Sequence, residues 1–459
     1  MSFSSFVFLI RFLPLALILY YIVPDKVKNP LLVVLSLIFY TWGDPKSLPA
    51  LLAIAAAGYI FSLLIEKSKK GKKAFLVAGL ILVLGSLAFY KYLGFIVTNL
   101  NTLIFEKLNI GLSVPRLASP LGISFFAFTT ASYIIDVYKG VSNACRNVVD
   151  YLLYITFFPK LLMGPIMRYK DFEPQLHDRV IFESQLEKGA LRFVKGLAKK
   201  VLLADSVSAL WNEVSSLGYE NVSTPFAWLG ILAYTLQLYY DFSGYSDMAL
   251  GLANMIGFTL PENFNYPYSS KSATEFWRRW HMTMGEWFKQ YVYFPLGGSR
   301  CSRSRMMLNT FIVWALTGLW HGAAWNFVLW GIFYFILLML EKNFYLEFLN
   351  KHPFIGHIYT IFVTLVGWSL FAVSDFTSLF ALLKKMFVFS GGYSCLYSLR
   401  NYGVLLIVCS VLSLEKAGKI FNRLSSKTWF RLAATIVLLL LSLAYMTDAT
   451  YQPFLYAQF

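Results

Sequence analysis

Long runs of apolar residues alternate with short polar intervals along almost the whole chain. A helix rises about 1.5 Å per residue, so about 20 apolar residues are needed to cross a hydrocarbon core of ~30 Å. Lipid offers the backbone no hydrogen-bond partners, so runs of this kind are expected to be helices. The pattern predicts membrane spans over about residues 4–23, 29–43, 47–65, 74–98, 119–138, 148–167, 224–242, 244–260, 306–320, 323–340, 355–373, 400–414 and 429–447.

A different pattern occupies residues 183–205, where Lys188, Arg192, Lys195 and Lys199 recur at spacings of four, three and four. Apolar side chains keep a similar rhythm on the other side, which predicts an amphipathic helix. We expect this helix to lie in the cytoplasmic interface, rather than to cross the membrane, and to anchor the chain to lipid.

Aromatic residues and a histidine share the segment 274–295. On a helix, Trp277, His281 and Met284 would share a face, with Trp280 beside them. A proline and two glycines that follow would stop this helix short of a full span. Non-helical backbone is tolerated at membrane depth only inside protein or beside water, so we expect a re-entrant or interfacial segment that lines a cavity.

A second histidine lies in an uncharged run of 35 residues from Met306 to Leu340. One helix of that length would measure ~52 Å, which exceeds the bilayer, so a break is expected in the region of Gly318 to Gly322. These two glycines flank His321 with little bulk, which would let a substrate chain approach the imidazole.

The composition supports a membrane protein and argues against a nucleic-acid partner. A chain that is 58% hydrophobic and only 14% charged is not a soluble enzyme. The net charge of +16 comes from lysines and arginines that cluster beside apolar runs, as the positive-inside rule expects of cytoplasmic loops. The four cysteines are scattered without C-x-x-C spacing, so free thiols are expected rather than disulfides or a metal site.

Basic clusters also predict how the chain crosses the membrane. Residues 66–73 hold five lysines and are expected on the cytoplasmic face. Basic residues from 416 to 431 place the start of the last span inside, so the tail 448–459 is expected outside. The first apolar run lacks a basic n-region and a cleavage site, so it is expected to be retained. We expect residues 1–459 to form one domain of a multi-pass cell-membrane protein.

Two carboxylates, Asp241 and Asp247, lie in an aromatic and apolar stretch. A carboxylate in such a setting needs a charged partner or a water-filled cavity. Arg278 and Arg279 are the expected partners, since a guanidinium group can bind a carboxylate in a bidentate way. We interpret both aspartates as members of structural ion pairs.

His321 is a candidate general base. Partial desolvation keeps an imidazole neutral, and a neutral imidazole can accept a proton near physiological pH. The group that this base would deprotonate is a hydroxyl that attacks an activated acyl group. The alternative is a buried histidine that hydrogen-bonds a neighbouring helix. No Gly-x-Ser-x-Gly elbow or Cys–His pairing indicates a covalent serine or cysteine mechanism.

Six motifs carry a resemblance that spans nearly the whole chain. They are FYTWG at 39–43, FFPKLLMGPI at 157–166, DFSGYSD at 241–247, WRRWH at 277–281, YFPLGG at 293–298 and LWHGAAWN at 319–326. Together they resemble the membrane-bound O-acyltransferase superfamily, and more narrowly its bacterial, alginate O-acetylase-like branch, which acylates cell-envelope polymers. That branch often has a neutral residue where Lys160 stands.

The resemblance implies an all-α polytopic membrane protein in which a ring of transmembrane helices surrounds a central funnel, with re-entrant and interfacial helices. It also implies that His321 is the catalytic histidine and that His281 is the second functional one. The residues expected to line or support the funnel are Trp277, Arg278, Trp280, Trp320, Asn326, Asp241 and Asp247.

The last six residues read Phe-Leu-Tyr-Ala-Gln-Phe. Taken alone, they indicate an aromatic anchor at the membrane interface. They also resemble the Phe-x-Tyr-x-x-Phe ending of envelope-acylation systems, in which the tyrosine carries the acyl group. Tyr456 is therefore a candidate acyl relay, and a phenol with a pKa near ~10 would need a neighbouring base to attack.

These patterns lead to one hypothesis and two rivals. An O-acyltransferase would move an acyl group, most simply acetyl, from a cytoplasmic thioester to an extracytoplasmic polysaccharide. Acetyl-CoA or an acyl-carrier protein would be the donor. As an alternative to anchoring the chain to lipid, residues 183–205 would form the face on which this donor docks. An external acyltransferase and membrane lipids are further expected partners, with no bound cofactor or metal. The rivals are D-alanyl transfer to teichoic acid and a transporter with a histidine proton relay.

Overall fold

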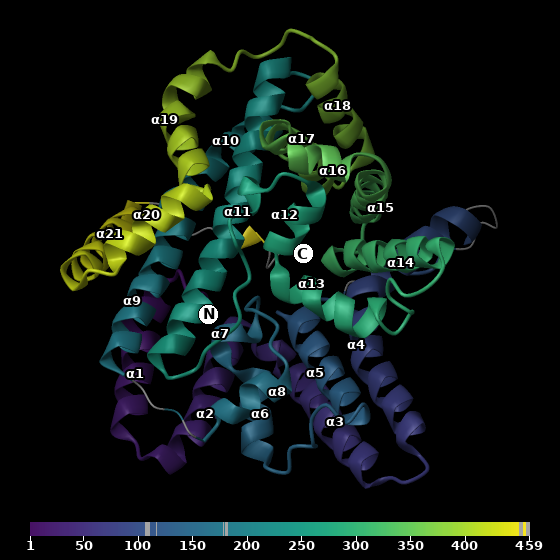
Figure 1. The fold of residues 1–459 in the computed structure, drawn as a ribbon, viewed down its shortest axis with the longest axis vertical. Coiled ribbons are helices and arrows are strands. Elements are labelled where there is room, and N and C mark those ends of the chain that lie inside the picture. Colours follow the sequence, from purple (N-terminus) through teal and green to yellow (C-terminus); the bar gives the residue numbers. More distant parts are fainter. Residues whose placement is uncertain (106–110, 116, 178, 180–181, 449–452, 456–459) are drawn as a thin grey trace. The chain divides into compact units, whose positions relative to one another are not determined.

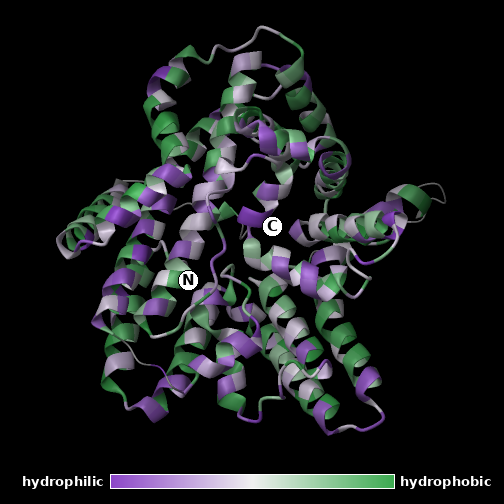
Figure 2. Cartoon of the chain, in the orientation of Figure 1, coloured by the Kyte–Doolittle hydropathy of each residue, from purple (hydrophilic) through white to green (hydrophobic). Residues whose placement is uncertain are grey.

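The protein is predominantly helical. The computed structural model describes residues 1–105, 111–115, 117–177, 179, 182–448 and 453–455. Within these ranges the only β feature is an isolated bridge between Val222 and Tyr393. Five of the described helices are long and apolar enough to cross a membrane, namely Pro45–Lys67, Lys72–Ile104, Trp325–Lys351, Pro353–Ala372 and Thr428–Thr447. The helices and their apolar residues (Figure 1 and Figure 2) confirm the predicted all-α, polytopic class.

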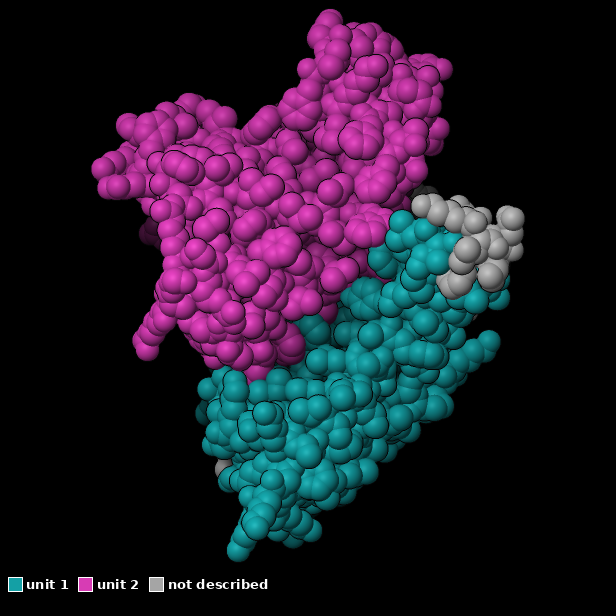
Figure 3. Space-filling view, turned by 90° about the vertical axis from the view of Figure 1, so that its right-hand side faces the viewer, with its two compact units in different colours: residues 1–186, 252–261 teal, residues 187–251, 262–459 magenta. Residues whose placement is uncertain are grey.

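The chain divides into two compact units, which Figure 3 colours separately. The first unit holds residues 1–186 and 252–261, and the second holds residues 187–251 and 262–459. All candidate site residues from the sequence fall within the ranges of the second unit. A single domain over the whole chain stays a prediction.

The first unit is a succession of helices of very different lengths. They are η1 Val7–Phe12, α1 Leu13–Ile22, α2 Asp25–Gly43, η2 Pro45–Ser47, α3 Leu48–Lys67, α4 Lys72–Leu100, η3 Asn101–Phe105, α5 Ile123–Tyr138, α6 Val148–Thr156, α7 Phe158–Leu161, α8 Tyr169–Phe172 and η5 Glu173–Gln175. The predicted span 148–167 is wrong, because α6 ends at Thr156. The Phe158 N–H donates to the Ser36 hydroxyl at 3.0 Å instead of continuing that helix.

The remaining described helices lie in the second unit, apart from the first residues of α9 and the last residues of α11. They are α9 Glu183–Ala198, η6 Lys199–Asp205, α10 Ser206–Ser216, α11 Thr224–Met255, η7 Pro267–Ser269, α12 Ala273–Arg279, α13 Met282–Phe288, η8 Lys289–Tyr293, α14 Arg303–His321, α15 Trp325–Leu340, η9 Glu341–Tyr345, α16 Leu346–Lys351, α17 Pro353–Ala372, α18 Phe376–Phe387, α19 Leu396–Leu412, α20 Glu415–Ser425 and α21 Thr428–Asp448. The separate spans predicted at 224–242 and 244–260 are wrong, because α11 is one helix of 32 residues.

Glycines let α9 and α11 cross with their backbones in contact. A Cβ atom on Gly196 would lie 2.5 Å from the Gly244 carbonyl oxygen, and a Cβ on Gly244 would lie 2.8 Å from that of Gly196. Seven residues further along α11, a Cβ on Gly251 would lie 2.6 Å from the Gly189 carbonyl oxygen. Small residues at such positions allow close helix packing. The order of these pairs makes the two helices antiparallel.

The predicted amphipathic helix is the first part of a longer element. α9, η6 and α10 hold 16, 7 and 11 residues and join without leaving the right-handed helical backbone. Their combined length is about 51 Å at 1.5 Å per residue. α21 runs beside this element in the same direction, because Arg431 near its start pairs with Glu187. Beyond its end, Pro453 accepts a hydrogen bond from Lys200.

Candidate active site

His281 lies at a break between two short helices of the second unit. α12 and α13, on either side of it, have 7 residues each, so the segment 274–295 stops short of a full span as predicted. His281 has a left-handed backbone (φ 43°, ψ 52°), which is uncommon for a residue other than glycine. Trp277, His281 and Met284 therefore do not share the face of one continuous helix, and that prediction is wrong.

Asn263 holds this break and orients the imidazole. Its backbone carbonyl accepts the Met282 N–H at 3.0 Å. Its side-chain oxygen accepts from the Thr283 hydroxyl and lies 3.0 Å from Nδ1 of His281. Its amide nitrogen donates to the Ser246 hydroxyl at 3.3 Å. Because an amide oxygen can only accept, Nδ1 of the neutral imidazole carries the hydrogen, and Nε2 is left as an acceptor.

The His281 ring is fully buried among aromatic side chains. It meets Phe242 edge-on at 4.7 Å between ring centroids, and Trp320 at 5.7 Å. Burial lowers the pKa of His281 to about 3, since an apolar environment disfavours the imidazolium form. The folded protein therefore holds this imidazole neutral at physiological pH.

His321 is the last residue of α14, next to the predicted break. The break is confirmed, because α15 begins only at Trp325. The His321 side chain is 2% exposed. Its ring contacts Trp320, Trp330 and Phe371, with centroids 5.0, 5.0 and 5.2 Å away. Since Trp320 contacts both imidazoles, the structure brings the two predicted histidines to the same indole ring.

The glycines beside His321 serve helix packing. A Cβ on Gly318 would lie 2.4 Å from the Phe327 carbonyl oxygen, and a Cβ on Gly322 would lie 2.1 Å from the Phe327 ring. The space that these glycines leave is thus filled by α15. The prediction that they open a path for a substrate chain is wrong, because the missing side chains make room for Phe327.

Tryptophans predicted to support the funnel pack in the interior of the second unit. The Trp277 ring meets Trp314 at 5.0 Å and Trp330 at 5.3 Å. The Trp280 ring, 1% exposed, meets Trp368 at 4.9 Å. These contacts join α12 to α14, α15 and α17. A role of the tryptophans in lining a funnel stays a prediction.

Asn326 fastens the start of α15 to the end of α17. Its amide nitrogen donates to the backbone carbonyls of Leu370 and Phe371 at 3.2 and 3.3 Å. Because the Phe371 ring contacts His321, this link helps to fix the wall against which the imidazole lies.

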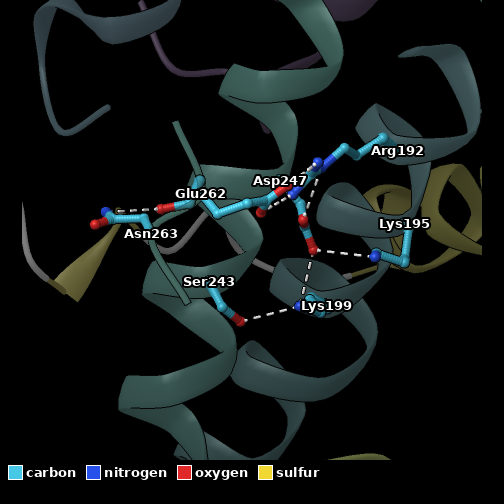
Figure 4. A network of polar contacts seen from close by, with 8 residues as sticks. Arg192, Lys195, Lys199, Ser243, Asp247, Glu262 and Asn263 are labelled. Atoms are coloured by element: carbon cyan, nitrogen blue, oxygen red, sulfur yellow. Dashed lines mark hydrogen bonds and ion pairs between the residues drawn. The ribbon is translucent and has the colours of Figure 1, made fainter. Parts of the chain in front are cut away.

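Asp247 lies at the centre of a cationic network, shown in Figure 4. Its carboxylate is 2.8 Å from Lys199 Nζ, 3.1 Å from Arg192 Nε and 3.5 Å from Lys195 Nζ. The other end of the Arg192 guanidinium binds Glu262 at 2.7 Å. The residue after Glu262 is Asn263, so this network also holds the loop that positions His281.

The prediction that Arg278 and Arg279 pair with the two aspartates is wrong. Arg279 pairs with Glu275 at 2.7 Å and with Glu415 at 3.1 Å, whereas Arg278 is exposed. The carboxylates are instead reached from α9 and η6, whose close crossing with α11 brings their basic side chains within range. Three of the four basic residues of the predicted amphipathic helix therefore turn towards Asp247, and only Lys188 is exposed.

Asp241 forms the predicted kind of ion pair, but its partner is Lys200. Its Oδ1 lies 2.7 Å from Lys200 Nζ, and both side chains are buried. Its Oδ2 accepts the Leu455 N–H at 2.8 Å. Tyr456, the candidate relay, lies outside the described residues.

Sequence reasoning missed Asn263 and Lys200. Asn263 lies in an irregular loop, where no periodic pattern marks it. Lys200 directly follows the predicted basic row, and the two aspartates on α11 were a signal that a neighbouring helix must supply charge. Among the residues that the structure describes, no three His, Cys, Asp or Glu side chains are grouped so that they could hold a metal ion.

Long apolar helices and two histidines buried among tryptophans define a helical, multi-pass membrane protein with a candidate acid–base site. Residues 146–407 match the model of the membrane-bound O-acyltransferase family. The chain belongs to this family and is an O-acyltransferase.

Three relatives indicate the range of acceptors in this group. The chain is 39% identical to a probable alginate O-acetylase of Azotobacter vinelandii, over 85% of this chain and 78% of that one. It is 32% identical to the peptidoglycan O-acetyltransferase of Helicobacter pylori, over 86% and 81%. It is 26% identical to the teichoic acid D-alanyltransferase of Bacillus subtilis, over 58% and 71%.

Proposed function

We propose that this protein takes an acetyl group from a thioester on the cytoplasmic side and delivers it towards a polysaccharide outside the membrane. The observation that carries the proposal is the pair of buried histidines around Trp320, in a chain whose relatives include a probable alginate O-acetylase and a peptidoglycan O-acetyltransferase. Acetyl-CoA is the simplest donor, and an acyl-carrier thioester is the alternative.

His321 is the proposed general base. It would take the proton of a hydroxyl as that oxygen bonds to the thioester carbonyl carbon. The carbon–sulfur bond then breaks, and the departing thiolate takes up the proton held by the imidazolium. The rings of Trp320, Trp330 and Phe371 surround this imidazole and fix its orientation.

His281 has a narrower proposed role. With the hydrogen on Nδ1 held by Asn263, the neutral ring offers only an acceptor at Nε2. Such an atom can accept from an N–H or O–H of the donor but cannot donate to an oxyanion. This favours orientation of the thioester donor over stabilisation of the oxyanion.

Tyr456 is the proposed acyl relay. The hydroxyl that His321 activates would be that phenol, and the acyl-tyrosine would then pass its group to an external acyltransferase and the polysaccharide. The support is the sequence of the ending and the attachment of the preceding residues to the second unit through Asp241 and Lys200.

Polymer acetylation in cells tests the base and the relay separately. His321→Ala should abolish polymer acetylation while the protein level and melting temperature stay unchanged, and normal acetylation would exclude His321 as the base. Mass spectrometry of the wild type should detect an acetylated C-terminal peptide, which Tyr456→Phe removes. Full acetylation by Tyr456→Phe would exclude the relay but leave the base untouched.

D-alanyl transfer to teichoic acid is the second candidate. It is favoured by the similarity to the teichoic acid D-alanyltransferase, although the acetyl-transferring relatives are more similar and cover more of the chain. Purified protein given labelled acetyl-CoA or a D-alanyl carrier thioester distinguishes the two, because only the true donor should label the tail.

A further inference from the structure

The described end of the chain is held by a buried ion pair in three ways. The backbone carbonyl of Pro453 accepts from Lys200 Nζ at 3.2 Å. The N–H of Leu455 donates to Asp241 Oδ2 at 2.8 Å. Between these two bonds, the Phe454 ring is 4% exposed and lies 4.8 Å from the Lys200 ammonium. We propose that Lys200 and Asp241 are positioning residues that clamp the tail and present Tyr456 for acylation.

The ammonium group of Lys200 has a geometry suited to this task. It has three hydrogens, and three oxygens surround it: Asp205 Oδ1 at 2.8 Å, Asp241 Oδ1 at 2.7 Å and the Pro453 carbonyl at 3.2 Å. Two carboxylates hold the amine in place, so one donor is left directed at the tail. Charge-assisted bonds in a buried setting are strong enough to fix a short segment.

The clamp recognises the tail mainly through its backbone. Pro453 and Leu455 contribute only main-chain atoms to these bonds, whereas Phe454 contributes its ring. That ring meets Tyr245 edge-on at 5.2 Å, on the same helix as Asp241. The phenylalanine is therefore the side chain that the clamp selects, since aromatic burial and a cation over the ring both favour it.

The position of the clamp on α11 links it to the histidine site. Phe242, the residue after Asp241, contacts the His281 imidazole at 4.7 Å. Leu455, the last residue that the clamp holds, directly precedes Tyr456 in the sequence. A contact that only stabilised the fold could lie anywhere on the unit. This one instead holds Leu455, the residue before the proposed relay, against α11, the helix that contacts His281.

The clamp rests on the proposed relay role of Tyr456, so its test needs a readout besides acetyl transfer. A nitroxide label on Leu455→Cys, in a background without the four native cysteines, reports how firmly the tail is held. The substituted side chain leaves the backbone bond to Asp241 intact. Lys200→Met, Asp241→Asn and Phe454→Ala should each release the label to the mobility of a free tail. Lys188→Met, an exposed lysine of the same continuous helix, should not.

Acetyl transfer is then measured on the unlabelled variants. Lys200→Met and Asp241→Asn should lower kcat at least tenfold without changing the KM for the thioester. A synthetic peptide of residues 448–459 should restore transfer to Phe454→Ala, which keeps Lys200 and Asp241, but not to Lys200→Met. A label that stays immobile in all three variants would overturn the clamp, whatever the activity. Full activity of Tyr456→Phe with an immobile label would instead refute the relay.

Discussion

Among single residues, the direction of hydrogen bonds limits what each buried polar group can do. Asn263 binds one imidazole nitrogen of His281 with an atom that can only accept, and its own orientation is fixed by Ser246 and Thr283. The tautomer of His281 therefore follows from a residue outside any sequence motif. In this tautomer Nε2 of His281 is a hydrogen-bond acceptor, which favours its proposed role in orienting the donor.

Substitution of Asn263 should alter catalysis through His281. Asn263→Ala removes the acceptor for Nδ1 and should lower kcat by about 10- to 100-fold, by analogy with residues that orient metal-bound histidines. Asn263→Asp keeps the acceptor and adds a negative charge, which raises the pKa of His281 and shifts the acid limb of the pH–rate profile upwards. An unchanged kcat and pH profile in Asn263→Ala would contradict this role.

Acid should destabilise the protein in part through His281. Burial lowers the pKa of this group to about 3 in the folded protein, whereas the unfolded chain has the ordinary value of about 6.5. Between these values the unfolded state binds more protons, so stability falls as the pH drops below about 6.5. From pH 7 to pH 5 the loss should be about 2 kcal/mol.

Melting temperatures in detergent check this linkage. The fall in melting temperature between pH 7 and pH 5 should be smaller in His281→Gln than in the wild type, because glutamine does not titrate. His352→Gln, a surface histidine variant, should keep the wild-type dependence. Equal pH dependence in His281→Gln and the wild type would show that this imidazole already titrates near its ordinary pKa.

Among the helices, backbone contact at glycines determines which charged side chains can form ion pairs. Gly189 and Gly196 on α9 lie against Gly251 and Gly244 on α11, so the two backbones touch. This crossing brings the basic residues of one helix to the two aspartates of the other. The same device joins α14 to α15, where Gly318 lies against Phe327.

An alanine at the α9–α11 crossing should therefore be costly. The added Cβ of Gly196→Ala would lie 2.5 Å from a backbone oxygen, which cannot move without separating the helices. Overpacking of this kind typically costs about 1–3 kcal/mol, so the melting temperature should fall by several degrees. Gly85→Ala on α4 is the matched control, because its Cβ meets nothing within 4 Å and alanine is the better helix former. Equal melting temperatures for the two variants would contradict the close backbone contact between α9 and α11 at Gly196.

Patterns with a period were predictable, whereas pairings between distant segments were not. Apolar length and glycine placement predicted the helical class and the break after His321. The boundary predicted between residues 242 and 244 lies inside α11, where Gly244 packs against the backbone of α9. The pairing of Asp247 with α9, rather than with Arg279, depends on a crossing that no local pattern in a single chain reveals.

For the molecule as a whole, the proposed function is acyl transfer between two compartments. The positive-inside rule predicts that the five lysines of residues 66–73 and the basic residues before α21 lie inside. The tail after α21 is therefore predicted to lie outside, and its residues 453–455 are hydrogen-bonded to Lys200 and Asp241. A tail held in this way would receive its acyl group inside the protein and release it outside.

Transfer in sealed proteoliposomes shows whether His321 is required to move acetyl groups across the membrane. Acetyl-CoA labelled in its acetyl group is supplied only on the side that carries the lysine-rich segment 66–73, and acetylation of Tyr456 and of an acceptor on the other side is measured. The wild type should acetylate both, whereas His321→Ala should acetylate neither while reconstituting equally well. Acetyl transfer across the membrane by His321→Ala at the wild-type rate would exclude His321 as the base.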